Sequence, residues 1–397
     1  MRRKRIAGWT ALALLVGALS VAAAGCGGGD DEGSASTEIE GLGTTLEEIQ
    51  ANAKTEGQVD LIAWAGYLEP AWAKPFEEQS GCKVNAKIGG TSDEMVTLMR
   101  TGNYDGVSAS GDATLRLIAA GDVAPVNFDL IPNYENVFEG LKGLAHNTDV
   151  NGVGYGVPHG RGANLMFWNT EKIPGDQTSW SLVWEADSPA AGKISMYDSP
   201  IQIADAAVYL KATQPDLNIT NPYELDEEQF NASVDLLKNQ KAGEYWSDAA
   251  KQIQSISSGN STAGTTWQYM LNQLAAADPP APVKGVLPEE GSTGWSDTWM
   301  IASNAAHPNC TYLWMDYIIS PEANAAATEY FGEAPVNEAA CGLTQDVNHC
   351  ATYHATDEDY FANVYYWNTP VADCGDDRGA VCKDYSQWTQ AWTEIRG

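Results

Sequence analysis

Basic residues are scarce in this chain. Its 397 residues include 22 Lys and Arg against 53 Asp and Glu, which gives a formal net charge of −31 at pH 7. A surface this acidic repels nucleic acid and anionic lipid, and it raises the local concentration of cations. Nucleic acid is therefore not an expected partner, whereas a cationic solute is compatible with the charge. An acidic surface can also serve solubility alone.

Histidines are few, and the signature motifs of common enzymes are missing. The chain has five His, and it contains no GxSxG, HExxH, GxxxxGK[ST] or helix-opening GxGxxG pattern. His159, beside Arg161, is a candidate general base, but no nucleophile stands at a readable spacing from it. The sequence therefore predicts a protein that is not an enzyme and needs no metal and no cofactor.

Long apolar runs are missing after residue 24, so no later stretch is expected to span a bilayer. Four cationic residues at positions 2–5 precede an apolar run and the sequence Ala-Ala-Gly-Cys. This pattern predicts a signal peptide over residues 1–25 and lipidation of Cys26, as in a bacterial lipobox; ordinary cleavage after an alanine is the alternative. Residues 26–45 are rich in Gly, Ser, Asp and Glu and predict a flexible tether. The mature chain would carry a net charge of −35, because 18 basic residues then face 53 acidic ones.

Six cysteines remain once Cys26 is assigned to the lipid. An even number in an extracytoplasmic chain suggests three disulfides. Sequence proximity favours two local bridges and leaves one long-range bridge: Cys341–Cys350, Cys374–Cys382 and Cys82–Cys310. A metal site within residues 349–354 is the alternative, which an oxidising compartment disfavours.

The body of the chain, from about residue 45, alternates segments with strand-like and helix-like patterns. Residues 59–64 are rich in β-formers, residues 66–81 have helical apolar spacing, and residues 82–88 alternate as a second strand. A capping-box helix begins at Thr91, and a third strand and helix follow within residues 101–126. Such alternation predicts a mostly parallel sheet with helices on both faces and with ligands at the carboxyl ends of its strands.

A second α/β set lies between about residues 162 and 294. About 350 residues are more than one hydrophobic core usually serves, so two lobes are expected. We predict an α/β protein with lobe 1 over residues 46–161 and 296–335 and lobe 2 over residues 162–295 and 336–397. The chain would cross between the lobes more than once.

Five stretches together carry a family resemblance: AWAGYLEP, GCKVNAKIGGTSDEMVTLM, SASGDATLRLIA, YDSPIQIADAAVYLKATQP and GWSDTW. In this order, from about Val59 to the C-terminus, they resemble the periplasmic spermidine/putrescine-binding proteins of ABC transporters, especially the YdcS-like branch. The resemblance implies the two-lobe periplasmic-binding-protein fold. It also implies a monomeric receptor that closes on its ligand by a hinge motion and delivers it to permease subunits in the membrane.

The resemblance further implies a set of ligand contacts. Matched position by position, they fall on Trp64, Tyr67, Ser110, Asp112, Asp198, Trp267, Trp295 and Asp297. An ammonium group is attracted to the face of an indole by roughly 0.5–2 kcal/mol, and a carboxylate adds a charge-assisted hydrogen bond. Asp198 and Asp297 are therefore expected to hold the two ends of a diamine. An Asp between two Trp can also merely cap a turn.

Three features depart from the family pattern. Arg161 stands where the polyamine receptors carry Trp, and Ile201 occupies a position at which some members place a second acid. Asp112 and Glu333 place acids where the family has aromatic or neutral residues, so Arg161 and Glu333 join the expected ligand-binding residues. If Arg161 faces the ligand, the site would suit a zwitterion, because guanidinium grips carboxylates. If Arg161 pairs with Asp112, Asp198 or Glu333, the cleft remains an amine site. The sequence leaves both open.

The expected function is therefore that of a solute-binding lipoprotein of an ABC importer on the outer face of the bacterial cytoplasmic membrane. Its ligand would be a polyamine or related small amine, captured when the lobes close. Three alternatives remain: the same receptor role for a zwitterionic amino acid or carboxylate, a secreted enzyme, and a surface adhesin.

Overall fold

The computed structural model describes residues 39–149, 151–240 and 242–397. The expected signal peptide, the expected lipidation site Cys26 and the first part of the expected tether lie outside these residues. The described residues belong to one compact unit, which spans residues 37–397. Within that described part, no helix combines the length and apolar character needed to cross a membrane.

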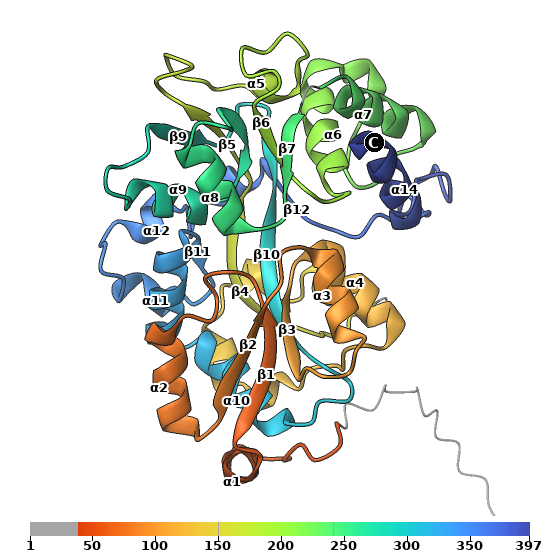
Figure 1. The fold of residues 1–397 in the computed structure, drawn as a ribbon. Helices are drawn as coiled ribbons and strands as arrows, with labels where there is room; N and C mark the ends of the chain where they lie inside the picture. The colour runs from red at the N-terminus through yellow and green to blue at the C-terminus, as the bar shows by residue number, and fades with distance from the viewer. Residues whose placement is uncertain (1–38, 150, 241) are drawn as a thin grey trace, which may run out of the picture. The chain divides into compact units, whose positions relative to one another are not determined.

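The larger of two sheets combines early strands with strands from the later part of the chain (Figure 1). Its strand order is β11-β4-β10-β3-β1-β2, with β12 paired to β10. The bounds are β1 Gln58–Ala63, β2 Lys83–Ile88, β3 Gly106–Ala109, β4 Val157–Ala163, β10 Ser292–Ile301, β11 Ala334–Pro335 and β12 Val364–Tyr366. β1 is parallel to β2 and β3, as the strand–helix alternation predicts, whereas β10 is antiparallel to β3 and β4. The sheet is mixed because β10 returns from the second sheet in the opposite direction.

The smaller sheet has the order β7-β6-β8-β5-β9. Its strands are β5 Leu165–Asn169, β6 Ile194–Tyr197, β7 Ala242–Trp246, β8 Ala263–Thr266 and β9 Val283–Val286. β6 is parallel to β7 and β8, and β5 is antiparallel to β8 and β9. The predicted two-lobe α/β architecture is confirmed, with mixed sheets in place of mostly parallel ones.

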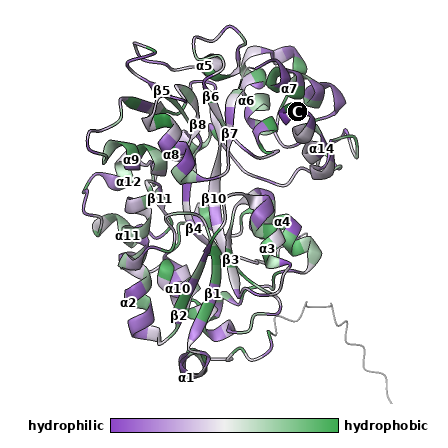
Figure 2. Cartoon of the chain, viewed as in Figure 1, coloured by the Kyte–Doolittle hydropathy of each residue, from purple (hydrophilic) through white to green (hydrophobic). Residues whose placement is uncertain are grey.

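Helices flank both sheets. They are α1 Leu46–Glu56, α2 Pro70–Ser80, α3 Ser92–Met99, α4 Gly111–Ala120, α5 Ser181–Trp184, α6 Gln202–Thr213, α7 Glu227–Asn239, α8 Ala249–Ser257, α9 Gln268–Ala275, α10 Pro308–Ile318, α11 Pro321–Phe331, α12 His349–Thr352, α13 Glu358–Phe361 and α14 Tyr385–Arg396. The Thr91 side chain caps α3 by accepting from the Glu94 backbone N–H. Figure 2 shows hydrophobic residues along β1 and hydrophilic ones on α2, whose Trp72 and Phe76 are buried. The core therefore lies between the sheets and the inner faces of their helices.

The chain changes sheets a few residues away from the predicted lobe boundaries. β4 stays in the larger sheet to Ala163, and β5 begins in the smaller sheet at Leu165, so the first change occurs at Asn164. β10 joins the larger sheet from Ser292, four residues before the predicted boundary at 296. The last part of the chain contributes to both lobes. β12 pairs with β10 of the larger sheet, and α14 packs against α7, which lies in sequence between β6 and β7 of the smaller sheet.

Residues 39–45, which the sequence placed in the tether, pack against the body. The Ile39 side chain is buried. The Gly43 backbone N–H donates to Asn309 Oδ1 at 2.9 Å, and Asn309 Nδ2 donates to the Gly41 carbonyl oxygen at 2.9 Å. Because α10 holds these residues in place, they do not form part of a free tether.

Three disulfides join the six cysteines as predicted: Cys82–Cys310, Cys341–Cys350 and Cys374–Cys382. The first joins the start of β2 to α10, with a Cα–Cα distance of 5.8 Å. The other two close local loops in the C-terminal part of the chain. Because the Cys350 sulfur is bonded to Cys341, it is not free to ligate a metal, and the alternative of a metal site at residues 349–354 is wrong.

Replacing both Cys82 and Cys310 by Ala is expected to lower the free energy of unfolding by about 2–5 kcal/mol. The bridge joins residues 228 positions apart, so its loss returns much conformational entropy to the unfolded chain. Chemical denaturation of the wild-type and variant proteins measures the difference. The matched control removes Cys374–Cys382, whose separation is only 8 positions, and should lose less. Equal losses would contradict the explanation from loop length.

Candidate ligand-binding site

Two buried carboxylates share one hydroxyl group at the centre of the site. The Tyr67 hydroxyl lies 2.9 Å from Asp297 Oδ2 and 3.1 Å from Glu333 Oε2. Ser110 Oγ donates to Asp297 Oδ1 at 2.5 Å, and Trp295 Nε1 donates to Glu333 Oε2 at 2.8 Å. None of these five residues is more than 3% exposed. We call Asp297 and Glu333 the acid pair.

The geometry of the acid pair favours a bound proton. The Tyr67 hydroxyl has one proton and can donate it to only one of the two carboxylates. Burial raises the pKa of Asp297 to about 7, because little water remains to stabilise its charge. Burial also raises the pKa of Glu333 to about 8, and the negative charge of Asp297 adds to that rise. A cation that reached the acid pair could replace this proton.

No basic side chain among the described residues neutralises the acid pair. His159 Nε2 lies 3.6 Å from Glu333 Oε1, but burial lowers the pKa of His159 to about 3, so its ring is neutral. Trp299 Nε1 donates to His159 Nδ1 at 3.2 Å, which places the ring proton on Nε2. In the part of the chain that the structure covers, no Lys or Arg forms an ion pair with either acid. The acid pair therefore has the electrostatic character of a cation site.

Aromatic rings from elements of both sheets surround a small cavity that Asp297, one member of the acid pair, also lines. A cavity of about 10 Å³ is lined by Trp64, Ser110, Trp267, Trp295, Asp297, Phe331 and Trp367, which we call the aromatic box. Trp64 follows β1 of the larger sheet and Trp267 follows β8 of the smaller one, with ring centroids 5.5 Å apart. The Trp267 and Trp295 centroids are 6.3 Å apart. Indole faces attract ammonium groups, so the box supplies the second element of an amine site.

A larger cavity of about 620 Å³ adjoins the aromatic box, because Trp64 and Trp267 line both. Loops from the two sheets meet beside it. The Tyr197 hydroxyl donates to the Gly90 carbonyl oxygen at 3.4 Å, and a Cβ at Gly90 would clash with the carbonyl oxygen of Ser247. The larger cavity therefore lies between elements of the two sheets, where a hinge motion would widen it.

Asp198, which the sequence assigned to the second end of a diamine, lies outside the aromatic box. Trp392 Nε1 donates to Asp198 Oδ1 at 3.0 Å, and Arg396 Nη1 lies 2.9 Å from Asp198 Oδ2. Both partners belong to α14. Asp198 and Asp297 therefore do not form the expected clamp in this structure, and the acid that shares a hydroxyl group with Asp297 is Glu333.

Asp112 is buried in the first turn of α4 and is not among the residues that line the aromatic box. Ser92 Oγ donates to Asp112 Oδ1 at 2.8 Å, while Oδ2 has no partner among the described residues. Burial raises the pKa of Asp112 to about 6, and the charge of Asp112 contributes to the raised pKa of Asp297. Asp112 thus affects the site through its charge and does not line the box.

Arg161 is held by the C-terminal part of the chain. Its Nη2 lies 2.8 Å from Glu358 Oε1 and donates to the Ala355 carbonyl oxygen at 2.9 Å. Its Nη1 donates to the Tyr366 hydroxyl at 3.2 Å, and the guanidinium carbon lies 3.8 Å from the Phe361 ring centroid. Arg161 was expected either to face the ligand or to pair with Asp112, Asp198 or Glu333. In the structure it does not line the aromatic box, and it pairs with none of these three acids. Glu358 offsets its charge, so the box remains acidic.

Two walls of the aromatic box were missed from sequence. Phe331 ends α11, and Trp367 follows β12. Trp367 is fixed by its indole N–H, which donates to Thr293 Oγ1 at 3.1 Å. The one available signal was the aromatic run at residues 365–367, and no sequence spacing connects that run to Trp64.

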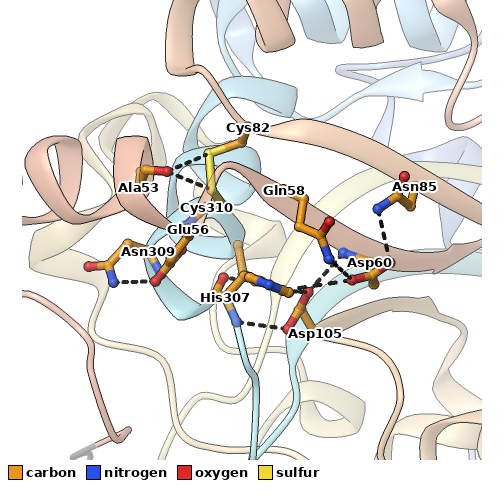
Figure 3. Close-up of polar contacts among 11 residues, drawn as sticks. Ala53, Glu56, Gln58, Asp60, Cys82, Asn85, Asp105, His307, Asn309 and Cys310 are labelled. Carbon is orange, nitrogen blue, oxygen red and sulfur yellow. Dashed lines mark hydrogen bonds and ion pairs between the residues drawn. A yellow bond between two sulfur atoms is a disulfide. The ribbon is translucent and has the colours of Figure 1, made fainter.

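A second cluster of ionisable side chains lies at another position in the larger sheet (Figure 3). Asp60, Asp105 and His307 each place one ligand-type atom within 4.8 Å of the others. His307 Nδ1 lies 2.8 Å from Asp105 Oδ2, and Asp105 also accepts from the backbone N–H groups of Asp60 and His307. These contacts fasten the start of α10 to β1 beside the Cys82–Cys310 bridge, so we interpret the cluster as structural.

Two α/β lobes that contribute walls to one buried polar site define a solute receptor. The comparison with protein families agrees: the model of the bacterial extracellular solute-binding proteins matches residues 71–348. The chain belongs to this family.

Individual relatives add detail. The chain is 25% identical over 324 residues, which cover 77% of it and 84% of the relative, to a putrescine/agmatine-binding protein of Pseudomonas aeruginosa. The structure is similar to the spermidine/putrescine substrate-binding protein PotD of Streptococcus pneumoniae, with a TM-score of 0.65, 16% identity and coverage of 85% and 97% of the two chains. It is also similar to the glucopine complex of MotA from A. tumefaciens, with a TM-score of 0.69, 16% identity and coverage of 86% and 100%. At these identities the solved structures support the fold alone.

Proposed function

We propose that this protein captures a small amine of the polyamine class outside the cytoplasm and delivers it to an ABC permease. The observation that carries the proposal is the acid pair. Asp297 and Glu333 are buried together, share the Tyr67 hydroxyl and have no basic side chain as an ion-pair partner among the described residues. Asp297 and five aromatic rings line the box, and Glu333 adjoins it through Tyr67 and Trp295. Carboxylates and indole faces suit an ammonium group, which offers several N–H donors and a positive charge. The name of the Pseudomonas aeruginosa relative, a putrescine/agmatine-binding protein, supports an amine ligand.

Closure of the lobes is the proposed mechanism of capture. The aromatic box, at about 10 Å³, has no room for an amine, so Trp64 and Trp267 must move apart to admit one. Because these two rings belong to different sheets, a hinge motion separates them. An ammonium that touches both rings and the acid pair binds the closed form better and shifts the population toward it.

The other end of the ligand is proposed to lie in the adjoining cavity of about 620 Å³. Glu94 and Asp248 line that cavity, although Lys87 already lies 3.2 Å from Glu94. One ammonium would therefore be held tightly at the acid pair and the other loosely. Amines of different chain length should consequently bind with similar affinity.

The proposed contacts follow from the walls of the aromatic box and the acid pair. They are Trp64, Tyr67, Ser110, Trp267, Trp295, Asp297, Phe331, Glu333 and Trp367. A lipid on Cys26 would hold a monomeric receptor at the outer face of the cytoplasmic membrane, near the permease. This part of the proposal is supported by the lipobox pattern of the sequence.

A thermal-shift panel of the mature protein tests the proposed ligand class. Putrescine, spermidine and agmatine should raise the melting temperature, because ligand at 100 times its dissociation constant adds roughly 2.7 kcal/mol of stability. 4-Aminobutyrate, glycine betaine and dicarboxylates are the comparison compounds. A shift with dicarboxylates and none with the amines would refute the proposal.

A further inference from the structure

Asp205 is a buried acid that does not line the aromatic box. It lies in the first turn of α6, which packs against β10. Thr293 Oγ1 donates to Asp205 Oδ1 at 2.6 Å, and Gln202 Nε2 donates to Asp205 Oδ2 at 2.7 Å. Burying a carboxyl group is costly unless its oxygens are paired, and here both are. One of the two partners, Thr293, belongs to β10, the strand that carries Trp295 and Asp297.

The Thr293 hydroxyl has no hydrogen-bonding capacity left over. Asn164 Nδ2 donates to Thr293 Oγ1 at 2.6 Å, and Trp367 Nε1 donates to the same oxygen at 3.1 Å. The amide NH2 and the indole N–H are donors only, so the hydroxyl oxygen accepts both bonds and gives its single proton to Asp205. Asp205 thereby turns the lone pairs of Thr293 toward Asn164 and Trp367. We call these four residues the Thr293 network.

The Thr293 network joins the connections between the two lobes. Asn164 is the residue at which the chain first leaves the larger sheet, and Thr293 lies near the start of β10, where the chain returns. Trp367 follows β12, on the connection toward α14. When a hinge opens, the lobes turn about such connections, and residues close to the hinge move little relative to one another. The network can therefore persist in the open form.

Trp367 needs the hydrogen bond to Thr293 because stacking fixes only the plane of its ring. The Trp367 ring lies nearly parallel to that of Tyr197, with the centroids 5.7 Å apart and an interplanar angle of 6°. A half turn about the Cβ–Cγ bond would keep this plane and reverse the direction of the N–H group. The bond to Thr293 selects one of these two orientations, and in it the ring lines the aromatic box.

We infer that Asp205 and Thr293 are positioning residues of the amine site, which hold Trp367 as a fixed wall of the aromatic box in both the open and the closed form. The inference rests on the proposed function and extends it to two residues that do not line the box. Trp64 and Trp267 separate when the lobes open, whereas Trp367 stays in place. A wall that is already ordered before binding costs less entropy on closure and so raises the affinity.

Titration calorimetry with putrescine tests the role of Thr293. Thr293→Val removes the hydroxyl at nearly constant volume and leaves the Trp367 N–H without a partner, so the dissociation constant should rise about tenfold. Thr293→Ser keeps the hydroxyl and should restore most of the affinity. Thr311→Val is the matched control, because this buried threonine donates to the His307 carbonyl oxygen at the start of α10, at 2.8 Å. It should leave the affinity unchanged.

The Trp367→Phe background shows whether Thr293 acts through the indole. Because Phe has no N–H group, Thr293→Val should cause less than about a twofold further loss of affinity in that background. The same tenfold loss in both backgrounds would overturn the inference. Wild-type affinity in Thr293→Val would overturn it as well.

A measurement without ligand separates this inference from the proposed function. In heteronuclear NMR spectra, the Trp367 indole N–H signal is assigned by its absence in Trp367→Phe. Its hydrogen exchange should be slow in the wild type and faster in Thr293→Val and Asp205→Leu. Asp205→Asn should keep exchange slow, because the amide oxygen still accepts from Thr293.

Equal exchange rates in the wild type, Thr293→Val and Asp205→Leu would overturn the inference, whatever the protein binds. If the wild type bound no putrescine while Thr293→Val still accelerated exchange, the proposed amine receptor would be contradicted and the anchoring of Trp367 supported.

Discussion

Asp297→Asn is expected to weaken amine binding by about 2–5 kcal/mol, which is roughly 30-fold or more in dissociation constant. The substitution keeps the shape of the side chain, but it removes a buried negative charge and replaces one of the two oxygens that accept from Tyr67 and Ser110 with an amide N–H donor. The ammonium would then face a neutral amide in a site with little water. Titration calorimetry with putrescine measures the loss.

Asp198→Asn provides the matched control for this substitution. The resemblance placed both aspartates at the ligand, but the structure commits Asp198 to Trp392 and Arg396 on α14. Its replacement should therefore change amine affinity by less than about 0.5 kcal/mol, as is usual away from a binding site. An equal loss in both variants would contradict the site described here and restore the clamp with one acid at each end.

Amine affinity is expected to fall steeply as the pH is lowered from about 8 to 6. The pKa of Asp297 is raised to about 7 and the pKa of Glu333 to about 8, so acidification protonates the acid pair in the ligand-free protein. A bound ammonium favours the ionised carboxylates and lowers both pKa values. Each proton released on binding changes the affinity by roughly tenfold per pH unit. Titrations at a series of pH values measure the slope.

The free energy of unfolding of the ligand-free protein should fall as the pH rises, whereas amine affinity rises with pH. In the unfolded chain these carboxyls titrate near pH 4, whereas in the folded protein burial raises their pKa values to about 7 and 8. The folded state therefore holds more protons in this window, and the stability that the acid pair contributes is lost as the pH rises through it. Glu333→Gln should reduce both pH dependences, and an unchanged amine slope in this variant would contradict the role of the acid pair.

Features set by local sequence were predicted well. Alternating strands and helices predicted the parallel β1–β2 and β1–β3 pairs, because each strand and its crossover helix are contiguous in sequence. The three disulfides followed from proximity and elimination. Trp295 and Asp297 lie near each other because both belong to one strand, so the GWSDTW stretch pointed to the site directly.

Features set by distant partners could not be predicted. Arg161 pairs with Glu358, 197 positions later, and Asp198 meets Trp392, 194 positions later. Nothing in the local sequence of either residue indicates these partners. The raised pKa values of the acid pair come mainly from burial, and the side chains that bury it belong to separate parts of the chain. Glu333 was predicted as a ligand-binding acid, but its shared hydrogen bonds with the Asp297 site through Tyr67 could be found only in the fold.

The most direct test of the account is titration calorimetry of the mature protein with putrescine at pH 7.5 in two buffers of different ionisation enthalpy. We expect one bound amine and a heat that differs between the buffers, because the acid pair releases protons on binding. Replacement of Asp297 by Asn should remove most of both signals. Putrescine binding with the same heat in both buffers, or no binding at all, would contradict capture of an ammonium by Asp297 and Glu333.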